Sequence, residues 1–79
     1  MIYVYILQSV SDPARFYVGL TRDLRERLKR HNAKSVTHTA KYAPWGSKTY
    51  TAFSDEAQAV AFERYLKSAS GRAFARKRL

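Results

Sequence analysis

The segment Phe16–Asn32 constrains the fold most, because a strand pattern leads there into a helix start within a few residues. Apolar side chains alternate with Tyr17 and Gly19, which is the period-2 pattern of a short strand. Asp23 then stands three residues before Glu26, the spacing of a capping box at a helix N-terminus. We therefore expect a strand over 16–20 followed by a helix over about 23–32.

The predicted helix carries two polar residues on one face. Arg27 and His31 are four apart and are therefore neighbours on the helix surface. Leu24 and Leu28 form an adjacent face that would dock on the sheet. Because the helix leaves from the end of the strand that holds Tyr17, we expect a phenol, a guanidinium and an imidazole close together at one rim of the domain.

The rest of the chain predicts two more strands and two more helices. Residues 2–7 are apolar throughout, as expected for a strand covered on both faces, and the short gap that follows favours an antiparallel hairpin. In such a hairpin Tyr5 and Tyr17 would lie near each other on one sheet face. The remaining segments are a long loop at 33–47, a strand at 48–53, a helix at about 56–69 and, after an interruption at Gly71, a short basic helix at 72–78.

This order, β-β-α-β-α-α, predicts one α+β domain over residues 1–79, with helices around a three-stranded antiparallel sheet. The long loop has a mixed basic and aromatic make-up that suits phosphates and bases. For its Trp45 we favour the alternative interpretation, in which the indole covers the core.

Charge predicts the class of partner. Fifteen Lys and Arg residues against six Asp and Glu give a net charge of +9, which favours a nucleic acid as partner over a merely solubilising surface. Basic residues crowd the segments 22–34 and 64–78. A membrane surface is disfavoured as partner, because neither segment pairs its charge with a broad, bulky apolar face. No segment approaches the roughly 18 apolar residues of a membrane helix, and no targeting segment is visible. The absence of cysteine rules out a disulfide framework and a thiolate zinc site and fits a cytoplasmic location.

Carboxylates are scarce for a nuclease that holds two metal ions. Most of them occupy turns or helix starts, and only Glu63 lies in the middle of a predicted helix, near its apolar stripe. The simplest interpretation of Glu63 is an exposed ion pair with Lys67 at i, i+4. The sequence shows no Ser/His/Asp arrangement, no phosphate-binding glycine loop and no pair of histidines spaced for zinc.

Tyrosines are more suggestive. A phenol is a poor base at pH 7 because its ordinary pKa is about 10, and a nearby positive charge would lower that value. The expected proximity of Tyr17 to Arg27 would supply such a charge. Strand packing remains the competing interpretation for Tyr3, Tyr5 and Tyr17, and His31 is as compatible with a cation at a helix C-terminus as with a functional group.

These residues together resemble the GIY-YIG nuclease family, in its small bacterial single-domain form. The resemblance covers the whole chain and depends on the combination of motifs rather than on any one tripeptide. The first motif of the family begins with glycine, and Tyr3 occupies that position here. The matching segments are Tyr3-Val4-Tyr5, Tyr17-Val18-Gly19, Arg27 with His31 and Asn32, residues 61–67, and the tail 70–75.

The resemblance implies hydrolysis of phosphodiester bonds in nucleic acid with one divalent ion, Mg²⁺ or Mn²⁺. Glu63 would be the sole protein ligand of that ion, with waters at its other positions. Tyr17 would activate the attacking water as a general base, directly or through the water shell of the metal. Arg27 would stabilise charge on the phosphate, Tyr5 would help to place the water or the phosphate, and His31 would assist proton movement or orient the phosphate.

Basic residues are expected to contact the nucleic acid backbone, with DNA favoured over RNA. Two alternatives to an independent nuclease stay open: a non-catalytic binding module, and an accessory subunit that cuts only with a protein partner. The second alternative follows from multi-domain relatives such as the excision-repair incision subunit, which carry additional DNA-recognition domains. These relatives also suggest a role in DNA repair. The expected contact residues are Arg22, Arg25, Lys29, Arg30, Lys34, Lys41, Lys67 and Arg72.

Overall fold

The strand that begins the chain lies in the middle of the sheet. In the computed structural model, which describes residues 1–79, β1 (Ile2–Ser9) pairs antiparallel with β2 (Phe16–Thr21) on one side and with β3 (Trp45–Phe53) on the other. A central strand covered on both faces needs apolar residues at successive positions, which explains the uninterrupted apolar run. The predicted three-stranded antiparallel sheet is confirmed.

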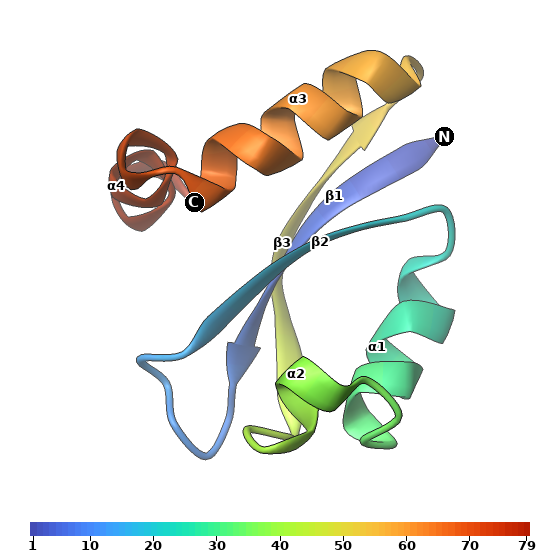
Figure 1. Ribbon diagram of the computed structural model, residues 1–79, viewed down its shortest axis with the longest axis vertical. Coiled ribbons are helices and arrows are strands. Elements are labelled where there is room, and N and C mark those ends of the chain that lie inside the picture. Colours follow the sequence, from blue (N-terminus) through green and yellow to red (C-terminus); the bar gives the residue numbers. More distant parts are fainter.

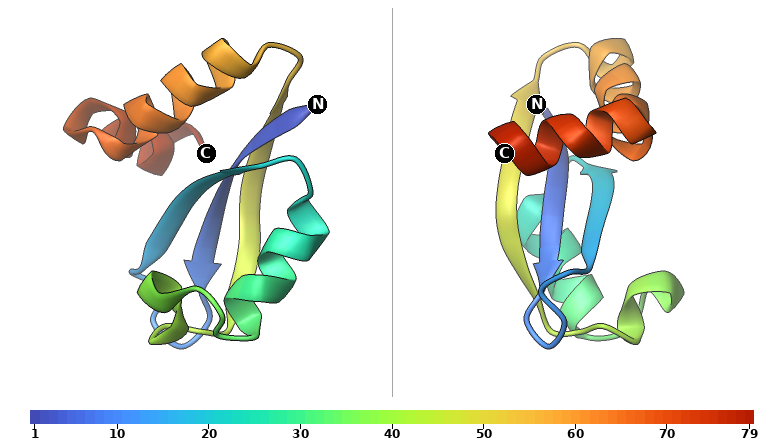
Figure 2. Two further views of the ribbon diagram at one scale, coloured as in Figure 1. Left: turned by 45° about the vertical axis from the view of Figure 1, so that its right-hand side comes forward. Right: turned by 90° about the vertical axis from the view of Figure 1, so that its left-hand side faces the viewer.

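Helices cover both faces of this sheet (Figure 1). On one face lie α1 (Leu24–Asn32) and the short α2 (Thr37–Ala40), and on the other lie α3 (Glu56–Lys67) and α4 (Ala69–Arg78). Figure 2 shows α4 crossing the strands on the side opposite to α1. The predicted α+β class and element order are confirmed.

The alternation of β1 divides the core into two parts. Ile2, Val4 and Ile6 pack with Ala59 and Leu66 on the α3 face. Tyr5, Leu7 and Trp45 form the second part, against which Leu24 and Leu28 of α1 pack as predicted. Consecutive strand residues point to opposite faces, so Tyr5 faces α1 while its neighbours face α3.

Side-chain caps fix where the helices begin. The carboxylate of Asp23 accepts a hydrogen bond from the N–H of Glu26, and that of Asp55 accepts from the N–H of Ala57. Both satisfy N–H groups that have no partner inside the helix. None of the four helices is long and apolar enough to cross a membrane.

Two details of the predicted organisation were wrong. The segment 33–47 is not one long loop, since it contains α2 and the start of β3. The two are joined by the buried Trp45, whose Nε1–H donates to the carbonyl of Thr39 at 2.8 Å. The break between the last helices falls at Ser68, whose hydroxyl caps the N–H of Gly71. Gly71 lies inside α4, where a Cβ atom would collide with the carbonyl group of Tyr65.

Candidate active site

Tyr5 occupies the centre of the candidate site because of the strand register. It lies opposite Gly19 in the β1–β2 pairing, and its ring covers that glycine so closely that a Cβ atom at position 19 would overlap the ring and the hydroxyl oxygen. The ring of Tyr17, two residues before the glycine, lies 6.3 Å from that of Tyr5 between centroids. The predicted proximity of the two tyrosines on one sheet face is therefore found.

A chain of buried hydrogen bonds joins Tyr5 to α1 and α2. The hydroxyl oxygen of Tyr5 lies 3.1 Å from Nε2 of His31, and Nδ1 of His31 lies 2.6 Å from the hydroxyl oxygen of Thr39. Thr39 donates its single hydroxyl hydrogen to the carbonyl of Val36, so its oxygen is left to accept from Nδ1–H of His31. Nε2 is then the acceptor for the Tyr5 hydroxyl.

The electrostatics of this chain favour neutral side chains. Burial raises the pKa of Tyr5 to about 12, the nearby Tyr17 and Glu63 act in the same direction, and Arg27 opposes them. Burial, followed by the positive charge of Arg27, lowers the pKa of His31 below its ordinary value. Near pH 7 Tyr5 is therefore a hydrogen-bond donor, and the lowered pKa of His31 favours a neutral acceptor over the predicted alternative of a helix C-terminal cation.

Arg27 and Glu63 complete the group from two different helices. Arg27 acts electrostatically on both Tyr5 and His31 from α1, and Glu63 acts on Tyr5 from α3. The ring of Tyr17 lies 4.9 Å from that of His31. Tyr5, Tyr17 and His31 thus lie side by side, and Arg27 and Glu63 lie close enough to Tyr5 to affect its pKa from helices on the two faces of the sheet.

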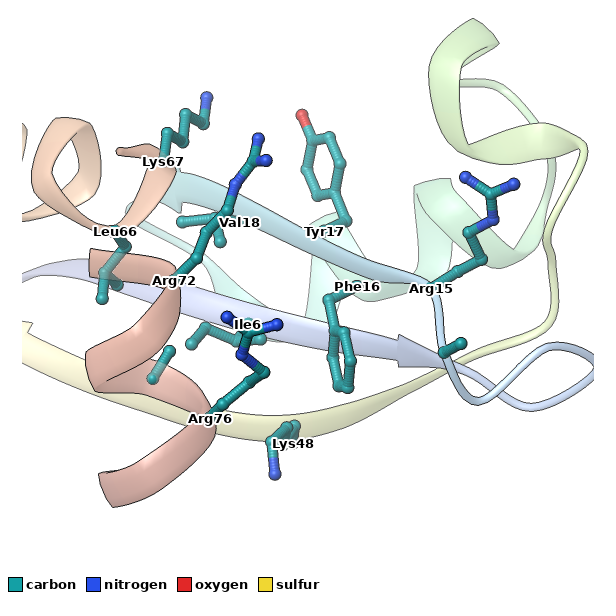
Figure 3. A pocket seen from close by; sticks show the side chains of 12 residues that line it. Ile6, Arg15, Phe16, Tyr17, Val18, Lys48, Leu66, Lys67, Arg72 and Arg76 are labelled. Carbon is teal, nitrogen blue, oxygen red and sulfur yellow. The ribbon is translucent and has the colours of Figure 1, made fainter. Parts of the chain in front are cut away.

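Glu63 differs from the other ion-paired acids in its exposure. Its Oε2 lies 2.6 Å from Nζ of Lys67, so the predicted i, i+4 pair is present. The Glu63 side chain is only 17 % exposed, however, whereas that of Glu56, paired with Arg22, is 63 % exposed. Figure 3 shows the charged end of Lys67 and the hydroxyl of Tyr17 pointing the same way.

The remaining acids are occupied elsewhere. Asp23 and Asp55 cap helices, and no group of three or more His, Cys, Asp and Glu side chains could hold a metal ion together. A magnesium ion keeps several waters and often takes only one or two carboxylates plus substrate phosphate oxygens. Glu63 therefore fits an ion that is held through one protein ligand.

The eight residues predicted to contact nucleic acid are all exposed. They lie on two sides of the molecule, six between Arg22 and Lys41 and two at the junction of α3 and α4. Arg22, Arg30 and Lys67 form ion pairs with Glu56, Glu26 and Glu63. The other five have no acidic partner: Arg25, Lys29, Lys34, Lys41 and Arg72.

One feature of the site could not be identified from the sequence, and another was marked without a role. Thr39 orients His31, but it lies in a segment without periodicity, and no spacing links it to the imidazole. Asn32 holds the start of β3 by donating from Nδ2 to the carbonyl of Trp45 at 3.0 Å. The resemblance had marked Asn32 beside His31 but gave it no role.

Comparison with known proteins gives a family match over almost the whole chain. The family model described as the GIY-YIG catalytic domain matches residues 1–78. No match was found among curated proteins or among solved structures.

Proposed function

This chain belongs to the GIY-YIG family, whose members are nucleases, and on that premise we propose that it is an endonuclease that hydrolyses phosphodiester bonds in DNA with one Mg²⁺ or Mn²⁺ ion. The observation that carries the proposal is the convergence of Tyr5, Tyr17, Arg27, His31 and Glu63. Structural packing alone does not require a guanidinium, an imidazole and a carboxylate around two phenols.

Glu63 would hold the metal ion. When bound, such an ion supplies positive charge that polarises a phosphoryl oxygen and makes water more acidic. Lys67 would exchange its contact with Glu63 for one with a phosphate. The side chain of Lys67 is 50 % exposed and can therefore reach an incoming phosphate.

The other four side chains would act on the phosphate and on the attacking water. Tyr17 would orient the water and accept its proton. Arg27 would stabilise the charge that develops on the phosphate, as preorganised cations do in sites shielded from water. Tyr5, held neutral by burial, gives its one hydroxyl hydrogen to His31, so its oxygen would accept a hydrogen bond from the attacking water and help to place it.

One observation favours a second candidate, a nucleic-acid-binding module without catalytic activity. The carboxylate of Glu63 already has a partner in Lys67, which would suffice for a structural role. The low exposure of Glu63 and its electrostatic effect on Tyr5 favour the nuclease, because a purely structural ion pair would not need to adjoin the tyrosines.

Cleavage assays with and without metal separate the two candidates. Pure protein is incubated with single- and double-stranded DNA and RNA, with Mg²⁺, Mn²⁺ or EDTA, beside Glu63→Gln and the control Glu56→Gln. We expect cleavage that EDTA and Glu63→Gln abolish and Glu56→Gln preserves. Binding without cleavage on every substrate would support the module, and cleavage independent of metal and Glu63 would refute the assigned site.

The setting of the activity is also part of the proposal. The net charge of +9 suits backbone contacts, which position a protein on nucleic acid but carry no sequence information. Specificity would then come from the structure of the substrate or from a protein partner. We further propose a cytoplasmic location, in keeping with a chain that has no cysteine, and a role in DNA repair.

A further inference from the structure

A groove lies between α4 and the sheet, on the face opposite α1. Its floor is apolar and includes Ile6, Val18 and Leu66, and its volume is about 800 Å³. Figure 3 shows the groove opening beside β2, with residues of α4 along one wall. A space of this size exceeds what one ordered water or ion would fill.

The rim of the groove is cationic. No acidic residue lines it, and Lys48, Arg72 and Arg76 have no acidic partner. A concave surface with one sign of charge concentrates ions of the opposite sign. A second copy of this strongly basic chain would be repelled, so the charge indicates a polyanion as the occupant. The five basic residues of the rim are Arg15, Lys48, Lys67, Arg72 and Arg76.

Phe16 adds an aromatic surface to this groove. It alternates with Tyr17 along β2 and therefore faces the same side as Val18, yet it is 45 % exposed. Nζ of Lys48 lies 6.0 Å from the centre of its ring. An exposed ring between cations is the arrangement on which single-stranded nucleic acids stack a base while their phosphates are neutralised.

The groove is continuous with the candidate active site around one edge of the sheet. β2 is an edge strand, and Phe16 and Tyr17 are consecutive residues that point to its two faces. The lining of the groove includes Tyr17 and Lys67, the partner of Glu63. A single strand of nucleic acid that passes over the edge of β2 would therefore reach Tyr17 directly from Phe16.

We propose that this groove binds an unpaired nucleic-acid strand next to the scissile phosphate, with one base stacked on Phe16 and phosphates on Lys48, Arg72 and Arg76. The inference rests on the proposed function and narrows its substrate to single strands or to duplexes with a single-stranded extension. A continuous duplex cannot use the groove, because its bases are stacked on each other and offer no face to the ring.

Binding without metal tests the groove separately from cleavage. Fluorescence anisotropy in EDTA would measure the affinity of wild type and Phe16→Leu for a labelled oligothymidylate and for a blunt duplex. Leucine keeps an apolar side chain but removes the aromatic plane. We expect the affinity of Phe16→Leu for the single strand to fall on the order of tenfold, which corresponds to the loss of one base–aromatic stack. Its affinity for the duplex should stay within about twofold of wild type. Phe74→Leu, at an exposed aromatic of α4 outside the groove, should bind as wild type does.

A second variant keeps the test decisive if Phe16→Leu folds poorly. In Phe16→Trp the new indole should be quenched by the oligothymidylate, whereas the buried Trp45 serves as the unquenched reference in wild type. Equal losses of affinity for the single strand and the duplex, or no quenching of the new indole, would refute the proposed role of the groove. Metal-dependent cleavage would be unaffected by that result. Selective loss of single-strand binding in a protein that cuts nothing would instead uphold the groove and refute the nuclease.

Discussion

The hydroxyl oxygen of Tyr5 lies 3.1 Å from Nε2 of His31, at the point where the central strand meets α1. Both residues are buried, and no buried side-chain polar atom lacks a hydrogen-bond partner. A buried polar network of this kind is costly unless every member is satisfied. Thr39 completes it, so the short helix α2 contributes to the candidate site although none of its residues was predicted to do so.

Replacement of Thr39 tests whether the hydroxyl orients His31. Thr39→Val keeps the shape of the side chain and leaves Nδ1–H of His31 buried without an acceptor, which costs about 1–3 kcal/mol. We expect the free energy of unfolding from urea titration to fall by that amount and the cleavage rate to fall as well. Thr37→Val, at an exposed position of the same helix, should change neither quantity, and an equal loss in both variants would argue against a specific role for Thr39.

The pH dependence of stability tests the neutral state of His31. Because its pKa is lowered in the folded protein, the unfolded chain binds a proton more readily, and acidification favours unfolding. The stability that comes from neutral His31 is therefore present above its ordinary pKa of 6.5 and is lost as the pH falls below that value. We expect the free energy of unfolding to fall more steeply between about pH 7 and pH 5 in wild type than in His31→Gln. Parallel curves for the two proteins would show that His31 does not titrate in this way.

The contact between Tyr5 and Gly19 predicts a matched pair of glycine substitutions. Gly19→Ala places a methyl group where the Tyr5 ring lies, which forces the ring to move and costs about 1–3 kcal/mol, as overpacking does. In Gly46→Ala the nearest atom is 4.0 Å from the new methyl group. Thermal unfolding and cleavage assays should show losses of stability and rate for Gly19→Ala alone. A fully active Gly19→Ala would mean that the position of the Tyr5 ring is unimportant.

Local patterns were sufficient to predict most of the fold. The apolar run of β1, the alternation of β2 and the cap Asp23 are properties of short segments, and each appears in the structure. The α2 helix has four residues and no side-chain cap, so periodicity could not reveal it. Gly71 suggested a break by its usual preference, but the close contact between α3 and α4 requires glycine there for space rather than for flexibility.

The candidate site was less predictable than the fold. Strand pairing and helix spacing placed Tyr5, Tyr17, Arg27 and His31 together, because those four residues lie within one strand–strand–helix unit. Glu63 joins them only through the packing of α3 on the far face of the sheet, and its place was implied by family resemblance. The roles of all five residues, and the contacts of the basic residues with nucleic acid, stay predictions.

The most direct test of the account is the single-turnover cleavage rate of Tyr17→Phe under saturating Mn²⁺. The substitution removes only the hydroxyl group, and Tyr50→Phe, at an exposed tyrosine of β3 outside the candidate site, is its control. Loss of general base catalysis typically lowers a rate by about 10²–10⁴-fold, so we predict a fall of at least about 10²-fold for Tyr17→Phe and an unchanged rate for Tyr50→Phe. Equal cleavage rates in wild type and Tyr17→Phe would contradict the account, because the hydrolytic site would then lie elsewhere.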